Sequence, residues 1–180
     1  MPPKELTPQE QFKKSLSEFD APIQKFANDC IGKMRKRLPR FLELVYDNWN
    51  ALVVGYGPNE RASDALFSIV IFPRYVSICF ITGASLVDKD KLLTGSGNQV
   101  RGIRLSSPDV LDHPGVKELM KQAIDRSTVK IPATQKTRMI IKSISAKRRP
   151  RRPTASAKKL VVKFASPASA KSSGSQSLKR

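Results

Sequence analysis

The pattern closest to a binding motif in this sequence is Gly95-Ser96-Gly97, followed by Arg101 and Arg104. Backbone N–H groups of a glycine-rich turn can cradle a phosphate, and two Arg side chains would add charge. A P-loop would continue into Lys and Ser or Thr on a helix, and both are missing here. A turn that needs positive φ accounts for the glycines and is the favoured interpretation. Gly95, Gly97, Arg101 and Arg104 therefore form a hypothetical small-anion site at the edge of a sheet, with a plain turn as the alternative.

No combination of side chains predicts catalysis. The one histidine, His113, precedes Pro114 at an expected helix start, where a capping role accounts for it. Cys30 and Cys79 fall at positions expected to be buried, so neither resembles an activated thiolate, and two Cys with one His make a poor zinc set. In a reducing compartment they are expected as free thiols rather than as a disulfide. We therefore expect a non-enzymatic protein with no cofactor and no metal.

The distribution of charge separates the chain into two parts. No Asp or Glu follows Asp125, whereas residues 126–180 contain 16 of the 33 Lys and Arg residues. The first 125 residues contain all 15 acidic residues and the other 17 basic ones. Nearly all of the net charge of +18 therefore lies beyond Asp125. Because Ser, Ala, Pro, Thr, Lys and Arg dominate there, the composition predicts a disordered basic tail over residues 127–180.

Within this tail, the segment Lys147–Pro153 (KRRPRRP) places five cations in seven residues. An extended cationic chain binds the phosphates of DNA or RNA by releasing counterions, without reading the base sequence. The Ala/Ser/Pro/Lys composition resembles the tails of linker histones and bacterial histone-like proteins. The expected nucleic-acid-binding residues are Lys147, Arg148, Arg149, Arg151, Arg152, Lys158, Lys159 and Lys163.

Other interpretations of the tail remain open. It can serve solubility alone, or bind a polyanion other than nucleic acid. An anionic membrane is less favoured because Pro and Ser residues would break an amphipathic helix. The sequence has no run of 18 apolar residues and no N-terminal apolar stretch typical of a secretory signal. We therefore expect no membrane partner and a cytoplasmic location. Association with the nucleoid is one option within that location.

The residues before the tail predict one folded domain over residues 9–126, after a frayed N-terminus at residues 1–8. Apolar spacing and capping signals indicate helices over residues 9–19, 20–38, 40–48 and 114–125. Runs rich in Val, Ile and Phe indicate strands over residues 51–56, 65–72 and 75–81, with a less regular strand near 100–105.

This order predicts a two-layer α+β domain, with the helices packed on one face of an antiparallel sheet of three to four strands. In the tail, the apolar clusters Met139–Ile141 and Leu160–Phe164 are each expected to form a transient strand or to dock on a partner.

Residues 42–124 resemble the YdhG-like domain, a small bacterial family of largely unassigned function. The matching residues lie in Phe80–Leu86 (FITGASL), in Leu92–Leu105 (LLTGSGNQVRGIRL) and in the helix that follows. The family's Leu-Leu-x-Gly-x-Gly turn and basic strand are matched by Leu92, Leu93, Gly95, Gly97, Arg101 and Arg104.

The resemblance implies a frataxin-like fold and, by analogy of fold, an iron-delivery role. Iron carriers of this type present carboxylate oxygens, which hard iron ions prefer. The N-terminal helices of this chain depart from that pattern, because Lys and Arg outnumber Asp and Glu on them. An iron carrier or a small-anion-binding domain with an incidental tail remains the alternative to nucleic-acid binding.

Overall fold

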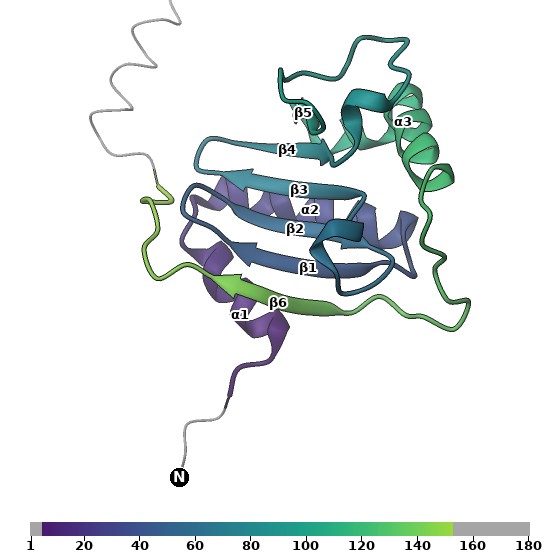
Figure 1. Ribbon diagram of the computed structural model, residues 1–180. Coiled ribbons are helices and arrows are strands. Elements are labelled where there is room, and N and C mark those ends of the chain that lie inside the picture. The colour runs from purple at the N-terminus through teal and green to yellow at the C-terminus, as the bar shows by residue number, and fades with distance from the viewer. Residues whose placement is uncertain (1–4, 153–180) are drawn as a thin grey trace, which may run out of the picture.

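The computed structural model describes residues 5–152, which form an α+β domain built on one six-stranded mixed sheet. The helices are α1 (Pro8–Ser17), α2 (Ala21–Arg37) and α3 (Pro114–Asp125). The strands are β1 (Leu42–Asp47), β2 (Leu52–Gly57), β3 (Phe67–Phe72), β4 (Tyr75–Phe80), β5 (Arg101–Leu105) and β6 (Met139–Ile144). Their order across the sheet is β5-β4-β3-β2-β1-β6 (Figure 1).

The α+β class and the antiparallel pairing of β3 with β4 confirm the expectation from sequence. The expected size of the sheet is wrong, because β1 and β6 extend it to six strands. β6 also makes the sheet mixed, since it pairs with β1 in parallel while the other neighbours are antiparallel.

The expected helix over residues 40–48 is instead strand β1. Both faces of this strand are covered, since Leu44 and Val45 point to opposite sides and are 0% and 2% exposed. A short apolar run of this kind suits a helix or a buried strand equally well. Pairing with β2 on one side and β6 on the other decides between them, because it satisfies the backbone N–H and C=O groups.

β6 also corrects the expected boundary between domain and tail. Met139 lies beside Glu43 of β1 and is 5% exposed in the core, and Arg138 C=O accepts a hydrogen bond from Glu43 N–H at 2.9 Å. Residues 127–152 thus contain a strand of the sheet rather than only a disordered tail. The second apolar cluster, Leu160–Phe164, lies outside the described residues.

The helices cover one face of the sheet, with α1 and α2 behind it in Figure 1 and α3 at one end. The core between the layers includes Ile31 and Met34 of α2, Ile69 and Ile78 of the central strands, and Leu119 of α3. Within residues 5–152, no helix has the length and apolar character that crossing a membrane requires.

The starts of the helices follow their sequence signals closely. Thr7 and Glu10 form a capping box at α1, so the ordered chain begins before the expected position at residue 9. His113 accepts a hydrogen bond from Gly115 N–H at 3.1 Å, which confirms its capping role at α3. Asp20 occupies the cap position of α2, but its side chain makes no capping hydrogen bond there.

We expect Met139→Ala to lower the free energy of unfolding by about 2–4 kcal/mol, because it removes a buried side chain and leaves a cavity under β6. Urea denaturation measures this change. Lys142→Ala, at an exposed position of the same strand, is the control and should shift stability by less than about 0.5 kcal/mol. Equal effects of the two substitutions would show that β6 does not pack on the core.

Candidate nucleic-acid interface

The basic segment after β6 lies at one end of the sheet, which we call the turn end. The row Asp47, Leu52, Ile71, Val76 and Leu105 crosses five strands in register at this end. The β1–β2 turn (48–51) and the two-residue β3–β4 turn (73–74) project just beyond this row. Since β6 runs parallel to β1, its C-terminal residue Ile144 reaches the same end, beside Asp47.

Residues 145–152, which we call the strap, continue from β6 along the turn end. Two backbone hydrogen bonds guide them, from Ser145 N–H to Asp47 C=O at 2.9 Å and from Arg149 N–H to Trp49 C=O at 2.9 Å. The strap is therefore tied by its main chain to the β1–β2 turn before any side chain contributes.

The strongest polar contacts of the strap meet at Asp47, whose side chain is 1% exposed. Arg151 donates from Nη2 to Asp47 Oδ1 at 2.6 Å and to the carbonyl oxygen of Asn48 at 2.6 Å. Arg148 donates from Nη1 to the other oxygen, Asp47 Oδ2. Two guanidinium groups thus bind one buried carboxylate, so the desolvation cost of that carboxylate is offset by charge-assisted hydrogen bonds.

The strap also contacts the junction between α1 and α2. Arg148 donates from Nη2 to Glu18 Oε1 at 2.9 Å, and Arg152 donates from Nη2 to the carbonyl oxygen of Ser17 at 3.2 Å. The Arg151 guanidinium carbon lies 5.3 Å from the centre of the Phe19 ring. These contacts join the last strand of the sheet to the first two helices.

The cations expected to bind nucleic acid therefore fall into two groups. Arg148 and Arg151 are part-buried and buried within ion pairs of the domain itself, so their hydrogen-bonding groups face the protein. Lys147, Arg149 and Arg152 are exposed. Arg152 approaches Asp20 only at 3.8 Å, with 64% of its side chain exposed. The remaining expected residues, Lys158, Lys159 and Lys163, lie outside the described residues.

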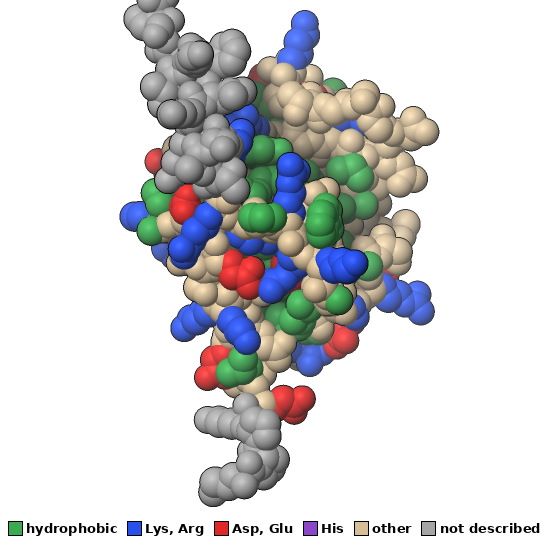
Figure 2. Space-filling view, turned by 90° about the vertical axis from the view of Figure 1, so that its left-hand side faces the viewer, with side chains coloured by type: hydrophobic (Ala, Val, Ile, Leu, Met, Phe, Trp, Pro, Cys, Tyr) green, Lys and Arg blue, Asp and Glu red, His purple; other side chains and the backbone are tan. Residues whose placement is uncertain are grey.

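The exposed cations share the turn end with hydrophobic side chains. Arg74, at the β3–β4 turn, is exposed, and so is Trp49, at 52%. Among residues 5–152, no carboxylate pairs with Arg74, Lys147 or Arg149. Figure 2 views the molecule from this side and shows Lys and Arg side chains interspersed with hydrophobic ones.

Of the residues of the hypothetical small-anion site, the structure places Arg101 beside the glycine turn and Arg104 on the other face of β5. Arg101 lies opposite the core residue Phe80 and Arg104 lies opposite Ser77, so the two guanidinium groups leave β5 on different faces. This follows from the two-residue period of a strand, because positions three apart point to opposite sides. Arg101 folds back on the carbonyl oxygens of Gly97 and Val100.

The glycine turn ahead of β5 agrees with the favoured interpretation. Gly95 has φ of +118°, in the region that a side chain disfavours, whereas Gly97 is not among the positive-φ residues. The backbone of this turn is further tied by reciprocal Thr94–Gly102 hydrogen bonds at 2.8 and 2.9 Å. The turn therefore serves to bring the chain back into β5.

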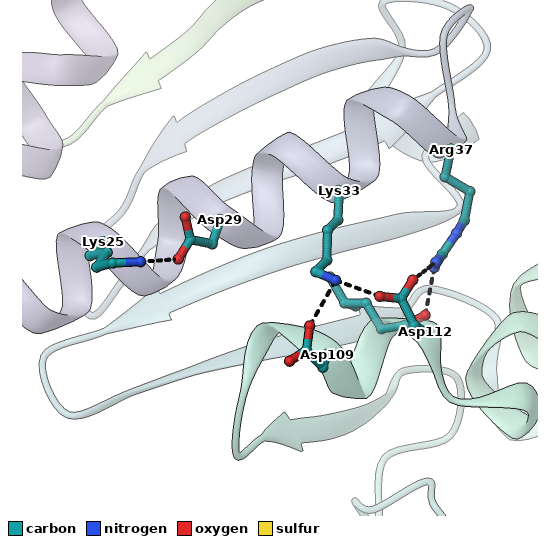
Figure 3. Close-up of polar contacts among 7 residues, drawn as sticks. Lys25, Asp29, Lys33, Arg37, Asp109 and Asp112 are labelled. Atoms are coloured by element: carbon teal, nitrogen blue, oxygen red, sulfur yellow. Dashed lines mark hydrogen bonds and ion pairs between the residues drawn. The ribbon is translucent and has the colours of Figure 1, made fainter.

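Several carboxylates on and beside α2 are held in ion pairs with Lys and Arg side chains of that helix. Asp109 and Asp112 are bridged by Lys33, and Arg37 also bonds to Asp112 at 2.7 Å (Figure 3). A metal ion would have to displace these two cations to use the carboxylates. No cluster of three or more His, Cys, Asp or Glu side chains suited to a metal occurs in residues 5–152.

Both cysteines are free thiols in this structure. Burial raises the pKa of the Cys30 thiol to about 12, with the nearby Asp29 carboxylate acting in the same direction. Burial also raises the pKa of Cys79. Each thiol therefore stays protonated at neutral pH and is a weak nucleophile.

Asp47 and its role were not predicted from the sequence. The available signal was the contrast between a carboxylate at the end of an apolar run and the Arg pair at 148 and 151, about a hundred residues later. Nothing in that spacing shows contact, because it arises only when β6 lies beside β1.

Comparisons of the chain with family models, curated proteins and solved structures found no match. The resemblance to the YdhG-like domain is therefore untested and stays a prediction from the residues named above.

We expect Asp47→Asn to lower the free energy of unfolding by about 3–5 kcal/mol, because it leaves the buried Arg151 guanidinium without a countercharge. Urea denaturation measures the loss, and faster trypsin cleavage after Arg148, which is followed by Arg149 and not by a proline, would report release of the strap. The control is Glu60→Gln, which removes the partner of Arg138 in an exposed ion pair and should cost less than about 1 kcal/mol. A stability loss for Asp47→Asn no greater than the control's would contradict the proposed role of this carboxylate.

Proposed function

We propose that this protein is a non-enzymatic nucleic-acid-binding protein, in which the basic C-terminal segment contacts phosphates without reading sequence. The observation that carries the proposal is the complete exclusion of Asp and Glu from residues 126–180, beside 16 Lys and Arg residues. The contacts of the strap refine the set of residues: Arg148 and Arg151 attach the segment, whereas Lys147, Arg149 and Arg152 present charge to solvent.

The position of the strap supports this division of roles. The carboxylates of Glu18 and Asp47 are paired with Arg148 and Arg151, so they add no unpaired negative charge beside the strap. Arg74 extends the exposed cations beyond the strap. A polyanion that approaches the turn end therefore meets several unpaired cations on a folded surface, and the residues after Arg152 add six more Lys and Arg.

The folded part is proposed to be a YdhG-like domain, on the residues of the Leu92–Leu105 segment. The alternative role as an iron carrier gains no support from Asp109 and Asp112, because these two carboxylates pair with Lys33 and Arg37. Nucleic-acid binding therefore remains the function that the arrangement of charges favours.

Replacement of Lys147, Arg149 and Arg152 together by Gln should weaken binding to a fluorescent DNA duplex. Each phosphate contact contributes about 0.9 to the slope of log K against log salt, so the slope should become shallower by about 2–3. Fluorescence anisotropy between 50 and 200 mM salt measures both affinity and slope. The sole tryptophan, Trp49, gives a second signal at the turn end.

The matched control removes the same charge at exposed positions away from the strap, with Lys89, Lys117 and Lys121 replaced by Gln. This variant should keep the slope of the parent chain. If both triple variants weaken binding to the same extent, only net charge matters, and a site on the strap is excluded.

Deletion of residues 153–180 should also lower affinity, because it removes six cations, including Lys158, Lys159 and Lys163. We expect the chain of residues 1–152 to keep weaker, salt-dependent binding through the exposed cations of the turn end. Anisotropy with the same duplex makes the comparison. Equal affinity of the two chains at both salt concentrations would remove residues beyond Arg152 from the proposed site.

A further inference from the structure

The face of the sheet away from the helices carries a group of planar side chains at the turn end. Phe72 and Tyr75 are paired across β3 and β4, next to the pair Ile71 and Val76. Since Ile71 and Val76 belong to the core, Phe72 and Tyr75 point to the opposite face. Within the described residues, no α-helix covers that face (Figure 1).

These planar groups are stacked on one another. The ring centres of Phe72 and Tyr75 lie 4.6 Å apart with 27° between their planes, and both side chains are partly exposed. Arg104 leaves β5 on the same face, and its guanidinium carbon lies 4.4 Å from the centre of the Tyr75 ring. Stacking and the cation–π contact fix the orientation of these side chains before any ligand arrives.

The stack lies at the end of the sheet that bears the exposed cations. The β3–β4 turn between Phe72 and Tyr75 contains Arg74, and the strap with Arg149 passes the neighbouring β1–β2 turn. A ligand that crosses this end thus meets cations beside planar π-faces. A single-stranded polynucleotide has the matching chemistry, since its phosphates suit the cations and its unpaired bases stack on aromatic and guanidinium planes.

On this basis we propose that the Phe72–Tyr75–Arg104 stack binds unpaired bases of a single-stranded nucleic acid whose phosphates contact the cations of the turn end. The inference rests on the proposed function and narrows its ligand class. In a duplex the bases are stacked on one another inside the helix, so their faces are not open to these planar side chains.

Charge favours this occupant over a second copy of the chain. A two-fold interface built on this face would bring Arg74 and Arg104 of one copy against a surface that carries the same two cations. Like charges brought together at an interface cost free energy, whereas a polyanion neutralises both residues. The exposed cations therefore select a negatively charged ligand, and the stack selects one that carries flat rings.

The test compares three polyanions with equal numbers of phosphates: a fluorescent single-stranded oligothymidine, a DNA duplex of mixed sequence and inorganic polyphosphate. The full chain should bind the single strand about 10-fold more tightly than the duplex, and polyphosphate should compete more weakly than the unlabelled single strand. Tyr75→Leu should remove that preference and leave duplex affinity unchanged, whereas Tyr75→Phe should retain it.

Arg104→Lys provides a second variant at an exposed position, which should not affect folding. It keeps the charge but removes the planar guanidinium, so single-strand affinity should fall several-fold while the salt slope stays constant. If Tyr75→Leu does not fold, Arg104→Lys alone tests whether the stack binds unpaired bases.

The outcomes separate this inference from the proposed function. Salt-dependent binding of the duplex with no preference for the single strand would overturn the inference alone. Equal losses for single strand and duplex in Tyr75→Leu and in Arg104→Lys would do the same. Binding to none of the three polyanions would overturn both.

Discussion

The buried carboxylate of Asp47 is the contact on which the arrangement of the C-terminal half depends. It lies at the end of β1 and accepts hydrogen bonds from Arg148 and Arg151, which follow β6. Without a countercharge, either the carboxylate or the guanidinium of Arg151 would be buried at a large cost in desolvation. The pair is therefore stable only when β6 lies beside β1 and the strap crosses the turn end. Formation of this ion-pair cluster thus requires that β6 has added to the edge of the sheet.

The same cluster explains why neighbouring cations have different roles. Arg151 is buried and Arg149, two residues earlier, is exposed, although both belong to one basic run. The strap is not a regular strand, since Arg148 and Arg151 lie three positions apart yet bind the same carboxylate. A run of Arg residues can therefore attach to a domain and still present charge. Composition alone treats all of these residues as equivalent, whereas the contacts of Asp47 and Glu18 distinguish them.

Much of the helical layer and of the central sheet could be predicted from sequence, because its signals are local. His113 before Pro114 marks the start of α3, and the short turn at Pro73 and Arg74 requires β3 and β4 to pair as a hairpin. β1 was expected as a helix and the start of β6 only as a transient strand, because their place in the sheet depends on partners about a hundred residues apart. The separation of Arg101 from Arg104 was predictable from strand periodicity once β5 was recognised, whereas the pairing of Asp47 with Arg151 was not.

Attachment of the strap also changes the energetics expected for phosphate binding. A disordered basic tail loses backbone and side-chain entropy when it orders on a polyanion, and that loss reduces affinity. The backbone of Arg149 is already held by its hydrogen bond to Trp49, and the adjacent Arg148 and Arg151 are fixed by ion pairs. Part of this conformational entropy is thus already lost when the protein folds, and not when the polyanion binds. Arg149 and its exposed neighbours can therefore act as a positioned group of cations rather than as isolated charges on a mobile chain.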